Sequence, residues 1–233
     1  MRFVFTPDWF LGQDVLINLF SFLILGLFFF FSIKNYGVSK NKRLLYLGIG
    51  FLLIALAEFS VVLTKFAIFY DTTVAQNIGR IIITYEVVKS LDIVYYLSFF
   101  FNRLFTLLGF YIIYRLPLKR ISGDFVLVVY SIFVISLLSH NFYYLYHFTA
   151  LIFLALVTRN YLKIYRQNKL PNTGIFVVAL SLLGLSQIMF ILSKISYMYV
   201  AAQVVQLISY ITLLILIMRI SKNGTKKQVK HNL

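Results

Sequence analysis

Apolar runs long enough to cross a membrane constrain the fold of this chain more than any other feature. The hydrocarbon core of a bilayer is about 30 Å thick, and a helix needs roughly 20 apolar residues to cross it. By this criterion the candidate spans are residues 15–33, 44–68, 93–114, 125–139, 142–158, 173–195 and 199–218. The chain is 61% hydrophobic and only 12% charged, which is too few charges to cover a soluble domain. The sequence therefore predicts an all-α integral membrane protein, a bundle of seven transmembrane helices.

The positive charges predict how this bundle is oriented. Sixteen of the 22 Lys and Arg residues fall in four segments on one side of a seven-span arrangement. These segments are residues 34–43, 115–120, 159–169 and 219–230. Loops rich in Lys and Arg stay on the cytoplasmic side of a membrane. We therefore expect a multi-pass protein of the cell membrane, with its N-terminus outside and its C-terminus in the cytoplasm.

The chain divides into three parts on this interpretation. Residues 1–14 form a short extracytoplasmic segment, residues 15–219 the transmembrane domain, and residues 220–233 a basic cytoplasmic tail. The tail is expected to be solvated and close to anionic lipid headgroups. Docking of a membrane or cytoplasmic protein partner on the tail is the alternative.

Spans four and five are the shortest of the seven. Residues 125–139 and 142–158 form a hairpin whose tip is Ser139-His140-Asn141. A re-entrant hairpin, which enters and leaves the membrane on one side, is the alternative to two full crossings. Because the two segments form a pair, either arrangement leaves the other spans in the same orientation.

Glu58 is the most conspicuous polar residue, because it lies in the apolar stretch LLIALAEFSVVLTKF. A carboxylate at the centre of a bilayer costs about 2.5–3.5 kcal/mol, so it usually faces the interior of a bundle and has a partner. From the helical rise of about 1.5 Å per residue, Glu58 lies roughly 12 Å below the outer surface and Arg103 roughly 15 Å below it. The two residues are on consecutive antiparallel spans. We therefore expect a direct or water-bridged contact between them.

Further polar residues extend from this pair toward the outer surface. Helical spacing places Lys65 on the face of Glu58, and Asp92 and Tyr96 on the face of Arg103. Spans six and seven add Gln187, Lys194 and Gln206. The inner halves of the spans are mainly Leu, Ile, Val and Phe. This distribution predicts an outward-facing polar pocket lined by Glu58, Lys65, Asp92, Tyr96, Arg103, Gln187, Lys194 and Gln206.

The charges of this set indicate the class of ligand. Its members carry three positive and two negative charges, which favours an anionic or zwitterionic solute. The alternative is that the polar residues only hold the helices together, at about 0.6 kcal/mol per hydrogen bond.

Several function classes are disfavoured by the sequence. It has no cysteine and no recognisable catalytic motif, so we expect no enzyme activity, no cofactor and no metal. The net charge is +15, but the basic residues lie in separate clusters between the hydrophobic runs. They do not form the continuous basic patch that binds nucleic acids. We expect a sensor-like, receptor-like or accessory subunit that binds a small solute. A small-solute transporter or channel and a purely structural subunit are the alternatives.

Overall fold

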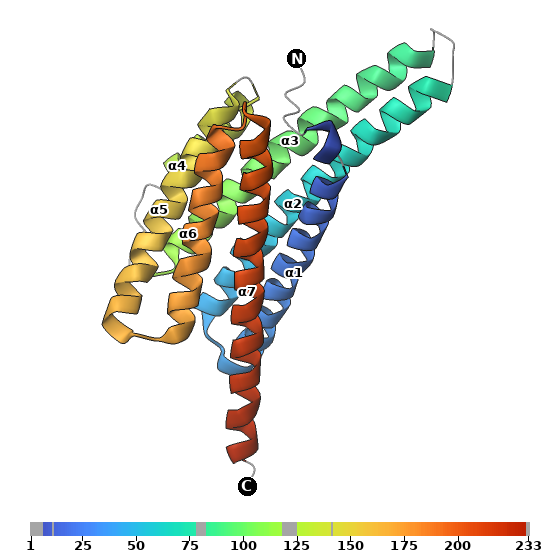
Figure 1. The fold of residues 1–233 in the computed structure, drawn as a ribbon. Coiled ribbons are helices and arrows are strands. Elements are labelled where there is room, and N and C mark those ends of the chain that lie inside the picture. The colour runs from blue at the N-terminus through green and yellow to red at the C-terminus, as the bar shows by residue number, and fades with distance from the viewer. Residues whose placement is uncertain (1–6, 11, 78–82, 118–124, 141, 232–233) are drawn as a thin grey trace.

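The computed structural model describes the backbone of residues 7–10, 12–77, 83–117, 125–140 and 142–231. Side chains are described over the same ranges except at residues 8, 66–77, 83–92, 94, 196 and 221–231. Within these ranges the fold is all-helical, as predicted (Figure 1). A short 3-10 helix, η1 (Asp8–Phe10), precedes the α-helices. They are α1 (Gln13–Ser39), α2 (Lys42–Asn77), α3 (Ile83–Arg115), α4 (Phe125–Leu138), α5 (Tyr143–Asn168), α6 (Pro171–Ile191) and α7 (Ser196–His231).

Six of the described helices are long and apolar enough to cross a membrane. The qualifying segments are Gln13–Ser39, Lys42–Lys65, Tyr95–Arg115, Tyr143–Asn168, Pro171–Ile191 and Tyr197–Ile220. α4 is apolar but has only 14 residues, which is about 21 Å of helix. The architecture indicates a multi-pass membrane protein.

α4 returns the chain along the side of α3. Phe125 of α4 packs near Tyr111 of α3, with 6.0 Å between ring centroids. Further along α4, Phe133 lies 5.5 Å from Phe100. His140, just after α4, lies 4.2 Å from Tyr96. α4 and His140 thus follow α3 back from Tyr111 to Tyr96, so α3 and α5 run in the same direction.

Close backbone contact fixes how α2 packs on α3. A Cβ atom placed on Gly109 of α3 would lie 2.7 Å from the carbonyl oxygen of Gly50 in α2. The same atom would lie 2.6 Å from Cγ1 of Ile54. No real side chain tolerates such distances, so the two helices approach this closely only because both positions are glycine. Around this crossing lie the buried side chains Phe51, Leu107 and Ile113.

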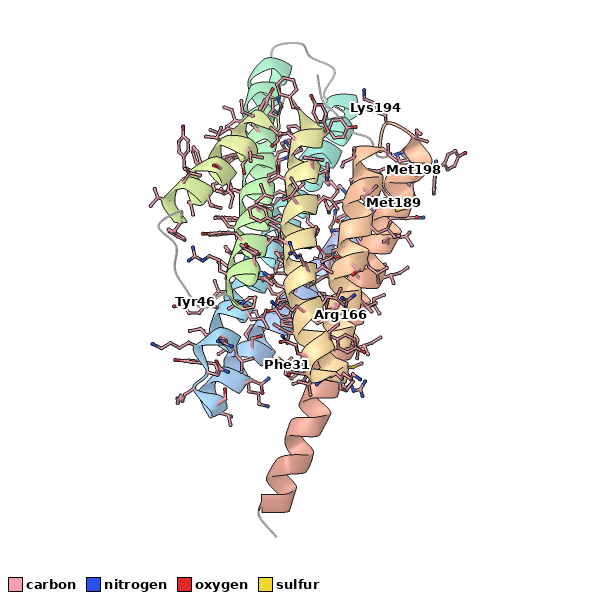
Figure 2. All side chains as sticks on the ribbon, turned by 90° about the vertical axis from the view of Figure 1, so that its left-hand side faces the viewer. Phe31, Tyr46, Arg166, Met189, Lys194 and Met198 are labelled. Atoms are coloured by element: carbon pink, nitrogen blue, oxygen red, sulfur yellow. The ribbon has the colours of Figure 1, made fainter. Side chains whose placement is uncertain are left out.

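The bundle has two chemically different ends. The basic end holds the turns between α1 and α2 and between α5 and α6, where Lys40, Arg43, Arg166 and Lys169 lie. The polar end holds the start of α1 and the turns between α4 and α5 and between α6 and α7. Figure 2 shows Lys194 at the polar end and Arg166 toward the basic end.

Buried polar side chains gather in the half of the bundle nearer the polar end. Of those described, Ser32 alone lies well inside the other half, and Thr106 and Ser209 lie close to the middle. The rest of this set is Asp14, Asn18, Ser21, Glu58, Thr64, Arg103, Ser136, Ser139, Ser186, Gln187, Ser193, Gln203 and Gln206. The half nearer the basic end is filled by apolar side chains such as Phe28, Phe176 and Leu216. The predicted separation of a polar half from an apolar half is therefore present in the fold.

Candidate functional site

Glu58 is bound by two neutral donors from α7. Gln206 Nε2 donates to Glu58 Oε1 at 2.6 Å, and the Tyr210 hydroxyl donates to the same oxygen at 2.8 Å. The Gln206 amide also donates to the Tyr210 hydroxyl at 3.1 Å. Gln206 and Tyr210 share one face of α7 because they are four residues apart. These bonds connect α2 directly to α7.

The predicted direct contact between Glu58 and Arg103 is wrong. No hydrogen bond or ion pair joins the two side chains within the part of the chain that the structure describes. The two positions do lie at one level of the bundle, because Asn102 Nδ2 donates to the carbonyl oxygen of Ala57 at 2.8 Å. One residue further along α3, the helix has turned by about 100°, so Arg103 projects elsewhere.

Arg103 instead lies against aromatic rings. Its guanidinium carbon is 3.4 Å from the centroid of the Phe99 ring, one turn earlier on α3. It is 5.4 Å from the centroid of the Tyr146 ring on α5. A cation over a ring face is stabilised by about 2 kcal/mol when both are desolvated. The charge of Glu58 also acts on Tyr146.

α5, α6 and α7 continue the series of contacts. His147 Nδ1 and Gln187 Oε1 are hydrogen-bonded at 2.8 Å, and the His147 ring stacks on Phe190 at 5.2 Å. Phe190 contacts Tyr199 at 5.8 Å, and Gln203 Nε2 donates to the Tyr199 hydroxyl at 3.3 Å. Together these contacts form an open circuit that runs from Arg103 on α3 through α5 and α6 to Gln203 on α7, beside the bonds that join Glu58 on α2 to Gln206 and Tyr210 on α7. We name this circuit the polar ring; its polar side chains are Glu58, Arg103, Tyr146, His147, Gln187, Tyr199, Gln203, Gln206 and Tyr210.

Three enclosed polar atoms in this half of the bundle have neither a hydrogen bond nor an ion pair among the described residues. They are the donors Asn18 Nδ2 and Arg103 Nη1 and the acceptor Gln203 Oε1. Arg103 is only 3% exposed and Asn18 only 2%. A buried polar atom left unpaired costs about 1–3 kcal/mol, and more when it is charged. The interior therefore presents free hydrogen-bonding capacity on α1, α3 and α7.

The charge of Lys65 acts on Glu58, as their shared helix face predicts, but its ion pair is with a residue of α1. Its Nζ forms an ion pair of 2.6 Å with Asp14 Oδ2 at the start of α1. Asp14 Oδ1 also accepts a hydrogen bond from the backbone N–H of Gly12 at 3.2 Å. Lys65 thus ties α1 to α2 near the polar end.

The other predicted wall residues do not join the polar ring. Lys194 is exposed in the turn between α6 and α7. Tyr96 is 48% exposed and packs on His140. Partial burial, together with the positive charge of Arg103, lowers the pKa of His140 below its ordinary value of 6.5. The side chain of Asp92 lies outside the described residues.

Four of the eight predicted pocket residues belong to the polar ring: Glu58, Arg103, Gln187 and Gln206. The predicted set lacks Tyr146, His147, Tyr199, Gln203 and Tyr210. Tyrosines and histidines near a membrane surface resemble an ordinary aromatic belt. The signal that could have found Tyr210 is its spacing of four from Gln206 on an otherwise apolar helix. Among the described residues, no group of three or more His, Cys, Asp or Glu side chains is arranged to hold a metal ion.

Comparison with known proteins gives no relative for this arrangement. No protein-family model, no curated protein and no solved structure matches the chain. The chemistry of the polar ring is therefore the basis for a functional assignment.

Proposed function

We propose that this membrane protein binds a small solute with an anionic group in the polar half of its bundle, as a sensor-like, receptor-like or accessory subunit. The observation that carries this proposal is Arg103. Its guanidinium is buried, and Nη1 has no acceptor among the described residues. Carboxylates and phosphates are the usual partners of arginine, because they accept two parallel hydrogen bonds from its planar group.

The surroundings of Arg103 support a bound anion. Phe99 and Tyr146 stabilise the cation through their ring faces, but a ring face does not accept a full N–H hydrogen bond from Nη1. Glu58 lies at a similar level of the bundle, but its carboxylate accepts hydrogen bonds from Gln206 and Tyr210 and not from Arg103. An incoming anion would accept the hydrogen bond that Arg103 Nη1 has free, without displacing an existing hydrogen bond.

The distribution of polarity supports binding more than passage of a solute. Beyond the polar ring, toward the basic end, the interior is filled by apolar side chains such as Leu107, Leu180 and Leu213. A transporter would have to open a route through this layer. Transport remains the second candidate, and uptake of a bound solute into proteoliposomes would establish it.

The basic end supports an orientation in which the polar half faces outside the cell. Arg115 and Arg166 lie in the last turns of α3 and α5, Lys169 caps α5, and Arg159 and Lys163 lie in the preceding turns of α5. The positive-inside rule assigns such an end to the cytoplasm, where it would meet anionic lipid headgroups. A ligand would then reach Arg103 from the extracytoplasmic side.

The proposal is tested by ligand-induced thermal stabilisation of purified protein in detergent. The probes are inorganic phosphate, sulfate and a panel of carboxylates, each measured against a chloride control of equal ionic strength. We expect at least one probe to raise Tm in the unmodified protein, because a ligand that binds only the folded state stabilises it.

Two variants decide whether Arg103 is responsible. Arg103→Gln should abolish the shift, and Arg103→Lys should reduce it, because lysine keeps the charge but loses the planar pair of donors. Arg159→Gln is the matched control, since Arg159 is exposed on α5 near the basic end. Equal stabilisation of the Arg103→Lys, Arg159→Gln and unmodified proteins would overturn the proposal.

A further inference from the structure

Glu58, the second charged side chain of the polar ring, has one carboxylate oxygen that accepts no hydrogen bond from the described residues. Both donors to Glu58 reach the same oxygen, Oε1. No hydrogen bond to Oε2 occurs among the described residues. An ionised carboxylate has acceptor sites on both oxygens, so Oε2 remains open to a further donor.

No cation of the described chain is placed to be that donor. Lys65, the nearest lysine on α2, forms its ion pair with Asp14. Arg103 is directed toward Phe99 and Tyr146. The described interior thus holds one carboxylate whose hydrogen-bond donors are both neutral, although the charge of Lys65 also acts on it, and one guanidinium without an anionic hydrogen-bond partner. Removing such a charge from water is unfavourable unless a partner compensates it.

The two charges are close to the same level of the bundle. The hydrogen bond from Asn102 Nδ2 to the carbonyl oxygen of Ala57 aligns the residues that immediately precede Arg103 and Glu58. Tyr146 is within electrostatic range of both charged groups. A small molecule that contacts both groups would lie beside Tyr146, whose ring centroid is 5.4 Å from the guanidinium carbon of Arg103.

We infer that the solute is a zwitterion of the amino-acid type, whose carboxylate contacts Arg103 and whose ammonium group contacts Glu58. This inference rests on the proposed function and names the class of ligand. A zwitterion compensates both buried charges at once and adds no net charge to the membrane interior. A simple anion would compensate Arg103 and leave the carboxylate of Glu58 with neutral partners only.

The surrounding residues indicate what kind of side chain the ligand carries. Phe99, Tyr146, His147 and Phe190 present ring surfaces around Arg103 and its neighbours. Such surfaces favour an apolar or aromatic group. The free acceptor Gln203 Oε1 is available to a second N–H or O–H of the ligand.

The test compares each of the twenty L-amino acids with two derivatives that each lack one charge. The N-acetyl derivative has no ammonium group, and the amide derivative has no carboxylate. Affinities are measured by calorimetry on the purified full-length protein. We expect at least one amino acid to bind the unmodified protein about tenfold or more tightly than both of its derivatives, since a hydrogen bond to a charged group contributes about 1.5–3 kcal/mol.

Two conservative variants assign the charges to residues. In Glu58→Gln, the preference over the N-acetyl derivative should disappear while the preference over the amide persists. In Arg103→Lys, the preference over the amide should fall while the preference over the N-acetyl derivative persists. A merely structural role for either residue would weaken all ligands equally, and that result would count against the inference.

The remaining outcomes separate this inference from the proposed function. If N-acetyl derivatives or inorganic anions bind as tightly as the amino acids, and Arg103→Lys weakens them, the anion site stands and the zwitterion inference is wrong. If no amino acid and no anion binds the unmodified protein, both are wrong.

Discussion

Glu58 is held by neutral donors and not by a cation, and this decides how the protein responds to substitution there. The donors Gln206 Nε2 and Tyr210 Oη both point to Oε1. A glutamine at position 58 can still accept both hydrogen bonds through its amide oxygen. A leucine cannot, and it would leave two buried donors unpaired.

We therefore predict opposite outcomes for Glu58→Gln and Glu58→Leu. Glu58→Leu should lower the free energy of unfolding by about 1–3 kcal/mol, the usual cost of an unpaired buried group. Glu58→Gln should leave it within about 1 kcal/mol of the unmodified protein. Thermal unfolding in detergent measures both.

Tyr210→Phe is the control for this pair of substitutions. It removes one donor and leaves Gln206 in place, so its loss should lie between those of the other two variants. A Glu58→Gln protein that is as unstable as Glu58→Leu would mean that the negative charge itself holds α2 against α7.

The level of single residues along their helices could be predicted from the sequence, but the direction in which their side chains point could not. The helical rise alone places positions 58 and 103 at similar depths, and the bond between Asn102 and Ala57 bears this out. Which side chain of α3 faces α2 depends on rotation of the helix by about 100° per residue. That rotation is set by contacts with the other helices, such as the packing of Arg103 on Tyr146, which no local pattern records.

At the crossing of α2 and α3, the two backbones leave no room for a larger side chain at Gly109. A Cβ on Gly109 would lie within 2.7 Å of a backbone oxygen of α2, so the helices would have to separate. Gly26 of α1 has nothing within 4 Å of the corresponding position. Both glycines lie inside apolar helices.

We predict that Gly109→Ala destabilises the protein and that Gly26→Ala does not. Both changes gain the same intrinsic helix propensity, about 0.8–1 kcal/mol, so their difference isolates the clash. Overpacking costs about 1–3 kcal/mol, and Gly109→Ala should be less stable than Gly26→Ala by that amount. Equal thermal stability of the two variants would show that α2 and α3 can move apart freely.

The number and order of helices follow from the apolar runs, whereas several helix ends do not. The predicted span 142–158 ends at the first charged residue, but α5 continues through Asn168. α7 likewise continues through His231, where the sequence analysis expects a solvated tail. A hydropathy criterion ends a span where polar residues begin, but Lys, Arg and Gln are good helix formers and extend the helix into water.

At the scale of the whole molecule, the direction of each helix follows from α4. Because His140 reaches Tyr96, the chain has returned to the polar end before α5 begins. α1, α3, α5 and α7 then run from the polar end to the basic end. The two termini of the bundle therefore lie at opposite ends, whatever the length of α4 (Figure 1).

Cysteine labelling tests this arrangement and the proposed orientation, since the chain contains no cysteine of its own. Tyr197→Cys and Phe142→Cys introduce exposed thiols at the polar end, and Gln167→Cys introduces one at the basic end. We predict that a membrane-impermeant maleimide labels the first two in intact cells. It should label Gln167→Cys only after the membrane is permeabilised.

Other labelling patterns have distinct meanings. Labelling of Gln167→Cys alone in intact cells would reverse the orientation and leave the fold intact. Labelling of Tyr197→Cys without Phe142→Cys would contradict the return of the chain along α3.

The charge pattern predicts the grouping of basic segments at one end, but the polar ring depends on tertiary structure. Five helices contribute to the ring, and the connection between Phe190 and Tyr199 is an ordinary aromatic contact that carries no signal in the sequence. Glu58 and Gln206 are 148 residues apart in the chain. Residues brought together over such separations cannot be paired from local spacing.

The short α4 has a consequence for the lipid around the protein. Its helix covers about 21 Å, against about 30 Å for the hydrocarbon core, and Val126, Leu127 and Tyr130 are exposed along it. A hydrophobic stretch shorter than the hydrocarbon core can be matched by thinning of the bilayer, so we expect the bilayer to be thinner on this flank than beside α1 or α6. A thinner membrane brings headgroups and water closer to the flank where α3 carries Arg103.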